Sequence, residues 1–109
     1  MFEVELTDVA EADIENSYLW WSTNRSANEA TRWYAEACRV IATLRVMPER
    51  CSPATESKLS IVGVRQLSFG IGKRPTHRIV FVIDGARVVV LRVRHHAEGW
   101  LSLSDLPIT

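Results

Sequence analysis

Two short runs of β-branched and aromatic residues, separated by an Asp-Gly step, constrain the fold of this chain more than any other feature. The runs are His77 to Ile83 and Val88 to His95, and Asp84, Gly85 and Ala86 lie between them. Asp and Gly tolerate the positive φ that a tight turn between two strands requires. The pattern therefore predicts an antiparallel β-hairpin.

A third strand is predicted just before the hairpin, over Gly63 to Phe69. The connection Gly70 to Pro75 has the glycines and proline of a loop and carries two cations. Residues 61–96 are therefore expected to form a three-stranded antiparallel meander, which holds most of the positive charge of the chain.

The first half of the chain predicts one strand and two helices. Residues Phe2 to Leu6 alternate apolar and acidic side chains, which is the period of a half-buried strand. Thr7 or Asp8 is suited to cap the first helix and Ser26 the second, because Asp8 and Ser26 each precede a glutamate by three residues. Apolar residues follow each cap at helical spacing: Ala10, Ile14, Tyr18 and Trp21, then Ala30, Trp33, Tyr34, Ala37, Ile41 and Leu44.

The predicted order is β-α-α-β-β-β in one domain of 109 residues. This order indicates an α+β fold in which a helical hairpin packs on one face of a small, mostly antiparallel sheet. Pro48 is expected to end the second helix, and Pro48 to Ser60 to run over the surface as a polar connection. The pattern does not fix the sheet neighbour of the first strand. It also leaves open whether the apolar tail 97–109 docks on the core, covers an edge strand or forms a dimer contact.

The formal net charge is zero, but the two halves of the chain differ. Residues 1–56 hold five arginines and ten acids, whereas residues 57–109 hold eight lysines and arginines and three acids. Such an asymmetry suggests a basic surface that meets an anion or an acidic partner. The alternative is that the acidic helices only keep the protein soluble.

No membrane segment, metal site or cofactor is expected. No run of about 18 apolar residues is present, and the first residues lack the features of a signal peptide, so we expect a cytoplasmic protein. Cys38 and Cys51 are expected to be reduced thiols. The histidines His77, His95 and His96 do not have the spacing of zinc ligands.

The alternation of side chains along the hairpin predicts a basic face on the sheet. If the turn has three residues, Val82 lies opposite Val88 and the arginines of both strands share one face. A two-residue turn would put Arg78 among apolar side chains, where an unpaired guanidinium is costly to bury. We therefore favour the three-residue turn. The arginines on the predicted face are Arg78, Arg92 and Arg94, with Arg65, Lys73 and Arg74 at its rim.

Clustered arginines are suited to phosphate, because each guanidinium offers a planar pair of donors and stays charged. The predicted phosphate- or target-binding residues are Arg65, Lys73, Arg74, Arg78, Arg92 and Arg94. A nuclease would also need a proton donor or acceptor, and its candidate catalytic residues are Arg78, Arg92, Arg94, His95 and His96. The alternative is that Arg92 and Arg94 pair with acids of a partner or of the helices.

Three segments resemble the RelE/ParE superfamily of type II toxin–antitoxin toxins, also known as plasmid stabilization proteins. They are Leu6 to Ile14, the run HRIVFVIDG that ends at Gly85, and the run VVVLRVRH that ends at His95. The resemblance covers Phe2 to about His96 and implies a single toxin domain over residues 1–109. It also implies a small sheet covered by two N-terminal helices, as the patterns predict independently.

The resemblance implies two possible targets. RelE-like members cut mRNA on the ribosome, whereas ParE-like members inhibit DNA gyrase. Arg78 matches a RelE arginine, but the position of a second RelE arginine falls near Glu98, and no tyrosine follows Tyr34. These departures favour a ParE-like, non-enzymatic gyrase inhibitor over a ribosome-dependent mRNA endoribonuclease. A decayed toxin that only binds its antitoxin is the third possibility.

Either branch implies a cognate antitoxin as the partner. Its C-terminal segment would wrap the toxin as a helix and an extended strand, and the complex could be a toxin–antitoxin heterotetramer, with a toxin homodimer as another assembly. A basic, partly apolar sheet surface with an exposed edge suits an acidic, disordered partner that folds on binding.

Overall fold

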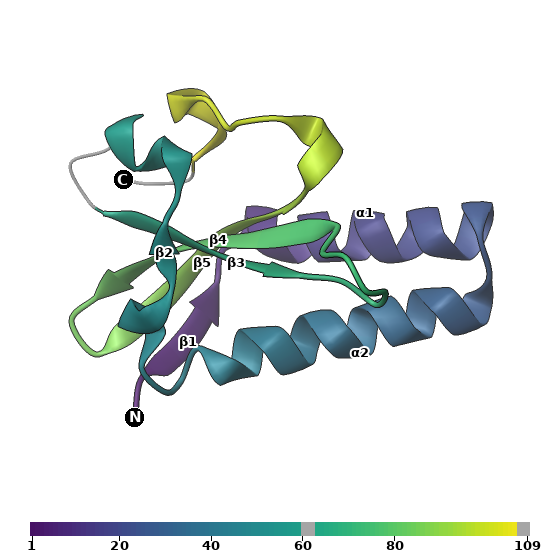
Figure 1. Ribbon diagram of the computed structural model, residues 1–109, viewed down its shortest axis with the longest axis horizontal. Helices are drawn as coiled ribbons and strands as arrows, with labels where there is room; N and C mark the ends of the chain where they lie inside the picture. Colours follow the sequence, from purple (N-terminus) through teal and green to yellow (C-terminus); the bar gives the residue numbers. More distant parts are fainter. Residues whose placement is uncertain (60–62, 107–109) are drawn as a thin grey trace.

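The computed structural model of the chain describes residues 1–59 and 63–106. One five-stranded sheet, in the order β1-β5-β4-β3-β2, carries two antiparallel helices, α1 and α2 (Figure 1). Strand β1 is parallel to β5, and the other pairs are antiparallel. The predicted α+β fold is thus confirmed. The bounds are β1 Glu3–Leu6, α1 Asp8–Asn24, α2 Ala27–Thr43, β2 Ser52–Pro53, β3 Val64–Phe69, β4 His77–Asp84 and β5 Arg87–His95.

Both helices begin at the predicted caps. The Thr7 hydroxyl accepts the N–H of Ala10 at 3.0 Å, and the Ser26 hydroxyl accepts the N–H of Glu29 at 3.0 Å. Each cap satisfies one of the N–H groups that a helix leaves unpaired at its start. Because Ser26 follows closely on the end of α1, the two helices form a tight hairpin.

The main core lies between the helices and the sheet. Trp33, Ala37 and Ile41 of α2 pack there against Ile79 and other buried residues of the central strands. Tyr34, predicted to be buried, is instead exposed and makes an edge-to-face contact with Tyr18 at 5.9 Å between ring centroids. Val40, which the prediction omitted, is buried in its place.

The hairpin turn is shorter than predicted. Asp84 pairs with Arg87, so only Gly85 and Ala86 form the turn, and Gly85 has a φ of 61°. Val82 consequently lies opposite Val89, not Val88. The three-residue turn was therefore wrong.

A β-bulge in β5 still brings the arginines to one face. Val80 pairs with Arg92 and Phe81 with Val90, which leaves Leu91 as an extra residue. The bulge shifts the alternation by one residue along the second half of β5. Residues that face the helices are Val88, Val90 and Val93, whereas Arg92 and Arg94 share the opposite face with Arg78. The predicted common face is present, but the bulge and not the turn produces it.

The stretch from Pro48 onward is not a plain surface connection. Helix α2 ends at Thr43, before the proline, and two 3₁₀ turns flank strand β2 at Pro48–Arg50 and Thr55–Leu59. Arg65 of β3 donates to the carbonyls of Glu49 and Cys51 at 3.2 and 2.7 Å, which fastens the stretch to the sheet. Its buried residues are Pro48, Cys51, Ala54 and Glu56. Ser60, the end of the predicted connection, lies outside the described residues.

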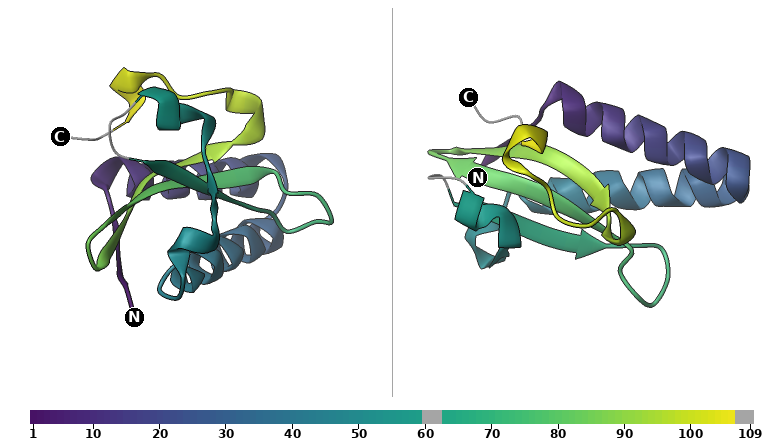
Figure 2. Two further views of the ribbon diagram at one scale, coloured as in Figure 1. Left: turned by 60° about the vertical axis from the view of Figure 1, so that its left-hand side comes forward. Right: turned by 90° about the horizontal axis from the view of Figure 1, so that it is seen from above.

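Of the alternatives for the tail, docking on the core is the one that the structure shows for residues 97–106. Leu101 and Leu106 are buried against Val80, Val82 and Leu91 in a second, smaller core. The tail and α2 lie on opposite sides of the sheet in Figure 1, and Figure 2 shows the tail from two further directions. Residues 107–109 of the predicted tail are not among those described.

Candidate functional site

Arg78 and Glu56 form a buried ion pair on the tail side of the sheet. Their exposed fractions are 3% and 1%, and both guanidinium Nη atoms donate to the carboxylate. Burial by itself would raise the pKa of Glu56, but hydrogen bonds from Arg78 and from the N–H of Leu101 lower it to about 2. Gln66 accepts a further bond from Arg78 at 3.2 Å. The Trp100 ring lies over the guanidinium, 5.2 Å from its centroid.

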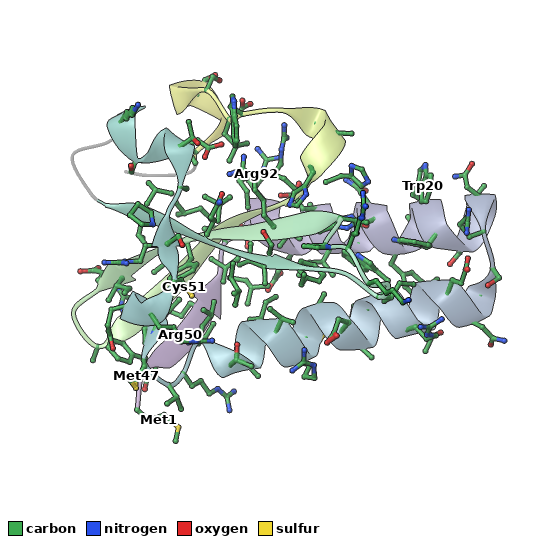
Figure 3. All side chains as sticks on the ribbon, in the orientation of Figure 1. Met1, Trp20, Met47, Arg50, Cys51 and Arg92 are labelled. Atoms are coloured by element: carbon green, nitrogen blue, oxygen red, sulfur yellow. The ribbon has the colours of Figure 1, made fainter. Side chains whose placement is uncertain are left out.

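Arg92 (Figure 3) is held by Asp13 of α1. Its Nε and Nη2 donate to the two carboxylate oxygens at 2.7 and 3.0 Å, and its Nη1 donates to the Asp105 carbonyl at 3.0 Å. The hydrogen bond to Asp13 raises the pKa of Arg92. Asp13 also accepts the N–H of Val93 at 3.0 Å, so one carboxylate binds both the side chain and the edge of β5. Pairing with an acid of the helices was the alternative to phosphate binding.

Arg94 pairs with Glu98 in the 3₁₀ turn His96–Glu98, at 3.4 Å. The Nε of Arg94 is buried and has no hydrogen-bond partner among residues 1–59 and 63–106. All three arginines on the sheet face therefore have carboxylate partners within the chain. A phosphate-binding role for them stays a prediction.

The other predicted cations lie elsewhere. Arg65 is bound to backbone carbonyls at the β2 edge, as described above. Lys73 and Arg74 are exposed on the loop between β3 and β4, which lies beyond the end of the sheet and not on the face of the three arginines (Figure 2). The sequence grouped these six cations on one surface, but in the structure they lie in three separate places.

His77 is buried between the helices and the sheet. The Trp33 Nε1–H donates to His77 Nδ1 at 3.3 Å, which assigns the ring proton to Nε2, 3.4 Å from the Ser17 hydroxyl. Burial, followed by the charges of His95 and His96, lowers the pKa of His77 to about 4. The ring is therefore neutral near pH 7. Because Nε2 carries the proton, His77 cannot act as a general base toward Ser17.

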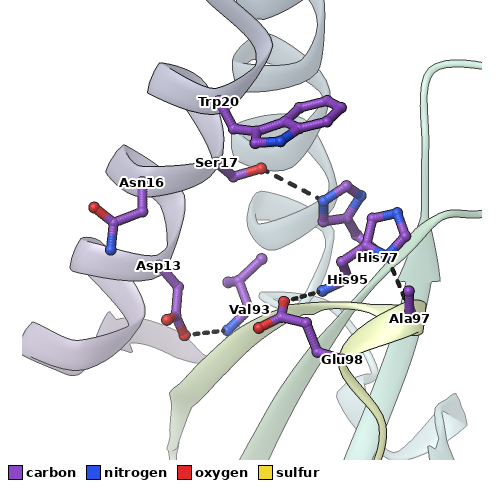
Figure 4. Close-up of a pocket in the computed structure, with 9 residues that line it drawn as sticks. All are labelled: Asp13, Asn16, Ser17, Trp20, His77, Val93, His95, Ala97 and Glu98. Atoms are coloured by element: carbon purple, nitrogen blue, oxygen red, sulfur yellow. Dashed lines mark hydrogen bonds between the residues drawn. The ribbon is translucent and has the colours of Figure 1, made fainter. Parts of the chain in front are cut away.

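A pocket of about 450 Å³ opens beside this histidine, between α1 and the end of β5 (Figure 4). Two of its lining groups are the carboxylates of Asp13 and Glu98, which are already bonded to the backbone N–H groups of Val93 and His95. The exposed His95 accepts the Ala97 N–H at its Nδ1, at 2.9 Å. The pocket is lined by Asp13, Asn16, Ser17, Trp20, His77, Val93, His95, Ala97 and Glu98.

The predicted acid–base candidates are exposed but separate. His95 borders the pocket beside α1, whereas His96 lines a smaller pocket of about 240 Å³ with Trp100 on the tail side. A catalytic role for either one stays a prediction. Within the described part of the chain, no group of three His, Cys, Asp or Glu residues is placed to hold a metal. Cys38 and Cys51 are free thiols, the first exposed and the second buried.

An apolar groove of about 550 Å³ runs between β1, α1 and α2. The exposed Tyr34 and the outer edge of β1 border it, and no strand of the described chain pairs with that edge. The N–H groups of Glu3 and Thr7 donate toward β5, so the N–H groups of Val4 and Leu6 point away from the sheet. This groove was not predicted from the sequence, although Tyr18 and Tyr34, one in the apolar stripe of each helix, were a signal for it. It is lined by Val4, Leu6, Glu11, Ile14, Glu15, Tyr18, Tyr34, Cys38, Ile41, Ala42 and Arg45.

Solved structures with a similar fold are known. The chain is similar to a structure titled "Chromosomal ParDE TA system from P. aeruginosa", with a TM-score of 0.68 and 20% identity over 87% of this chain and 96% of that one. A copper-bound mutant toxin from Helicobacter pylori aligns over 92% of this chain and all of its own, at 16% identity and a TM-score of 0.47. No curated protein sequence matches the chain.

The fold is thus that of a ParDE toxin: two helices on a five-stranded mixed sheet. Residues 4–100 match the family described as "ParE toxin of type II toxin-antitoxin system, parDE". The chain belongs to this ParE toxin family. Within residues 1–59 and 63–106, no helix is long and apolar enough to cross a membrane.

Proposed function

We propose that this ParE-family toxin stops growth by binding DNA gyrase in the cytoplasm and is neutralised by a cognate antitoxin. The observation that carries the choice of a binding inhibitor is the pairing of the three sheet-face arginines with Glu56, Asp13 and Glu98. A ribonuclease needs a cation free to stabilise the charge that develops in the transition state. Guanidinium groups already held by carboxylates are poorly suited to that role.

The groove beside β1 supports neutralisation by a peptide segment. An extended segment can pair with a free strand edge through its backbone and place alternate side chains into a neighbouring apolar groove. The outward N–H groups of Val4 and Leu6 provide such an edge, and Tyr34 lies at the border of the groove. We therefore assign this groove to the antitoxin. A heterotetramer of two toxins and two antitoxins stays a prediction.

Induced expression in a bacterial host, followed by assays of gyrase supercoiling and of mRNA cleavage on ribosomes, tests the target. We expect growth arrest, lost supercoiling and intact mRNA. A double variant with His95→Ala and His96→Ala is expected to arrest growth as the wild type does. Arrest with cleaved mRNA that this variant abolishes would replace the proposal with the nuclease function. Antitoxin binding without any arrest would indicate a decayed toxin.

The antitoxin site is tested by a matched pair of surface variants. Tyr34→Asp puts a charge at the groove, whereas Leu19→Asp puts the same charge on an exposed residue of α1 that does not line it. We expect the first to weaken antitoxin binding at least tenfold in calorimetry and the second to leave it unchanged. Equal affinity of the two variants would exclude the groove as the antitoxin site.

A further inference from the structure

The described chain has only a few cations that lack a partner, and they are not on the sheet face. Seven ion pairs engage Arg25, Arg39, Arg78, Arg87, Arg92 and Arg94. Arg50 and Arg65 are bound to backbone carbonyls. Lys73 and Arg74, adjacent on the exposed β3–β4 loop, are in no ion pair within the described ranges. Arg45, after the end of α2, and Lys58, in the 3₁₀ turn Thr55–Leu59, are also in no ion pair within these ranges, but they lie in other parts of the chain. Lys73 and Arg74 are adjacent on one exposed loop, so the unpaired positive charge is densest there.

Arg32 of α2 adds a third cation to the same place. Its Nη2 donates to the Ile71 carbonyl at 3.4 Å, which brings the guanidinium to the loop. The glutamates three and four residues away on the helix are Glu29 and Glu36, and these pair with Arg25 and Arg39 instead. The charge of Arg32 is thus not compensated along its own helix.

The loop is closed tightly at its base. Thr76 donates its N–H to the Phe69 carbonyl at 3.0 Å. A Cβ at Gly70 would lie 3.1 Å from both the Arg74 carbonyl oxygen and the Thr76 nitrogen, so a glycine lets the two ends of the loop approach. The loop lies beyond the end of the sheet in Figure 2. Such a closed loop holds its cations ready for a ligand at little cost in conformational entropy.

We propose that Arg32, Lys73 and Arg74 bind backbone phosphates of duplex DNA. The choice of DNA rests on the proposed function, because gyrase holds a DNA duplex that a bound inhibitor can reach. The loop Gly70 to Pro75 has no aromatic side chain on which an unpaired base could stack, which favours a duplex over a single strand. Contacts of this kind are made to the backbone and carry no sequence specificity.

The test measures binding of the purified toxin to a fluorescein-labelled duplex by anisotropy, at several salt concentrations. Three phosphate contacts predict a slope of log K against log salt of about −2.7. The double variant with Lys73→Gln and Arg74→Gln is expected to bind at least tenfold more weakly at low salt, with a slope of about −0.9. The matched control, with Lys58→Gln and Arg87→Gln, removes the same charge. Arg87 lies at the opposite end of β4 from the loop, and both control residues are exposed.

The outcomes separate this site from the proposed function. The site is excluded if the wild-type toxin does not bind the duplex at low salt, or if the two double variants lose affinity equally. A parallel supercoiling assay reports on the function. A wild type that binds DNA through the loop but does not inhibit gyrase would overturn the proposed function and keep the site. If the wild type inhibits gyrase and the loop variant binds DNA normally, the site is excluded and the proposed function is kept.

Discussion

Arg78 and Glu56 are joined by two hydrogen bonds and are both almost fully buried, with Trp100 over the guanidinium and the Leu101 N–H on the carboxylate. The pair connects β4, the turn after β2 and the C-terminal tail. Removal of one partner would leave a buried charge without compensation. Arg78, which the sequence suggested as a phosphate-binding residue, thus also joins three segments on the tail side of the sheet.

Glu56→Ala is expected to destabilise the protein by about 3–5 kcal/mol, because Arg78 would remain buried and unpaired. The double variant with Glu56→Leu and Arg78→Met should recover most of this loss, since it removes both charges. Urea denaturation gives both free energies of unfolding. A single-variant loss no larger than that of the double variant would contradict the coupling.

Acid should weaken this pair only at very low pH. The pKa of Glu56 is about 2 in the folded protein against an ordinary 4.5, so the unfolded chain takes up the proton first as the pH falls. The stabilisation is present above pH 4.5 and is lost as the pH falls through 2. In Glu56→Gln the fall in unfolding free energy between these values should be smaller than in the wild type, as measured by denaturation at fixed pH values.

His77 should govern stability in a higher pH range. Its pKa is about 4 when folded and 6.5 as the ordinary value, so the unfolded state binds a proton between these values and the native state does not. The contribution of His77 to the free energy of unfolding is therefore complete above pH 6.5. It is lost as the pH drops toward 4, by an amount on the order of 3 kcal/mol. His77→Leu should flatten this range, whereas His96→Leu removes only one of the charges that lower the pKa of His77 and should flatten it less. An unchanged profile in His77→Leu would refute the assignment.

Asp13 should stabilise the junction of α1 and β5. Asp13→Ala removes the acceptor of Arg92 and of the Val93 N–H, both partly buried, and we expect a loss of about 1–3 kcal/mol. The control Glu5→Ala breaks a pair with Arg87 in which both side chains are about half exposed, and it should cost less than about 1 kcal/mol. Amide exchange at Val93 should become faster in the first variant only. Equal exchange in both would contradict a stabilising role for the bond between Asp13 and the Val93 N–H.

Met47 offers a site for stabilisation. It has a φ of 48°, a left-handed conformation that favours glycine, and its side chain is 62% exposed. Met47→Gly should relieve about 1 kcal/mol of backbone strain with little loss of packing, which thermal unfolding would show as a raised Tm. Val46→Gly, next to it and also exposed, should lower the Tm because its φ is not positive. A lower Tm in both variants would argue against strain at Met47.

The sequence predicted the elements because their signals are local. Caps at Thr7 and Ser26, and the apolar period that follows each, act over three or four residues, and the hairpin signal at Gly85 needs only its flanking strands. These interactions form within one element or between neighbours. These elements can therefore be predicted from the sequence without knowing the tertiary packing.

The predicted site needed information that no local pattern contains. The bulge at Leu91 sets the face of Arg92 and Arg94, and a bulge has no period in sequence. Glu56 lies in a stretch that appeared to be a polar connection, yet it is buried because β2 joins the sheet beside β3. Such placements depend on which distant segments of the chain pack against each other.

The charge asymmetry shows the difference between the two levels. Sequence alone determined that acids collect in the first half of the chain and basic residues in the second, and it favoured an external partner. The tertiary structure pairs the halves with each other: Glu5 with Arg87, Asp13 with Arg92 and Glu56 with Arg78. Each pair spans more than twenty residues, so only the packing of distant elements, driven by burial of apolar side chains on both faces of the sheet, decided which cations became internal partners and which stayed free.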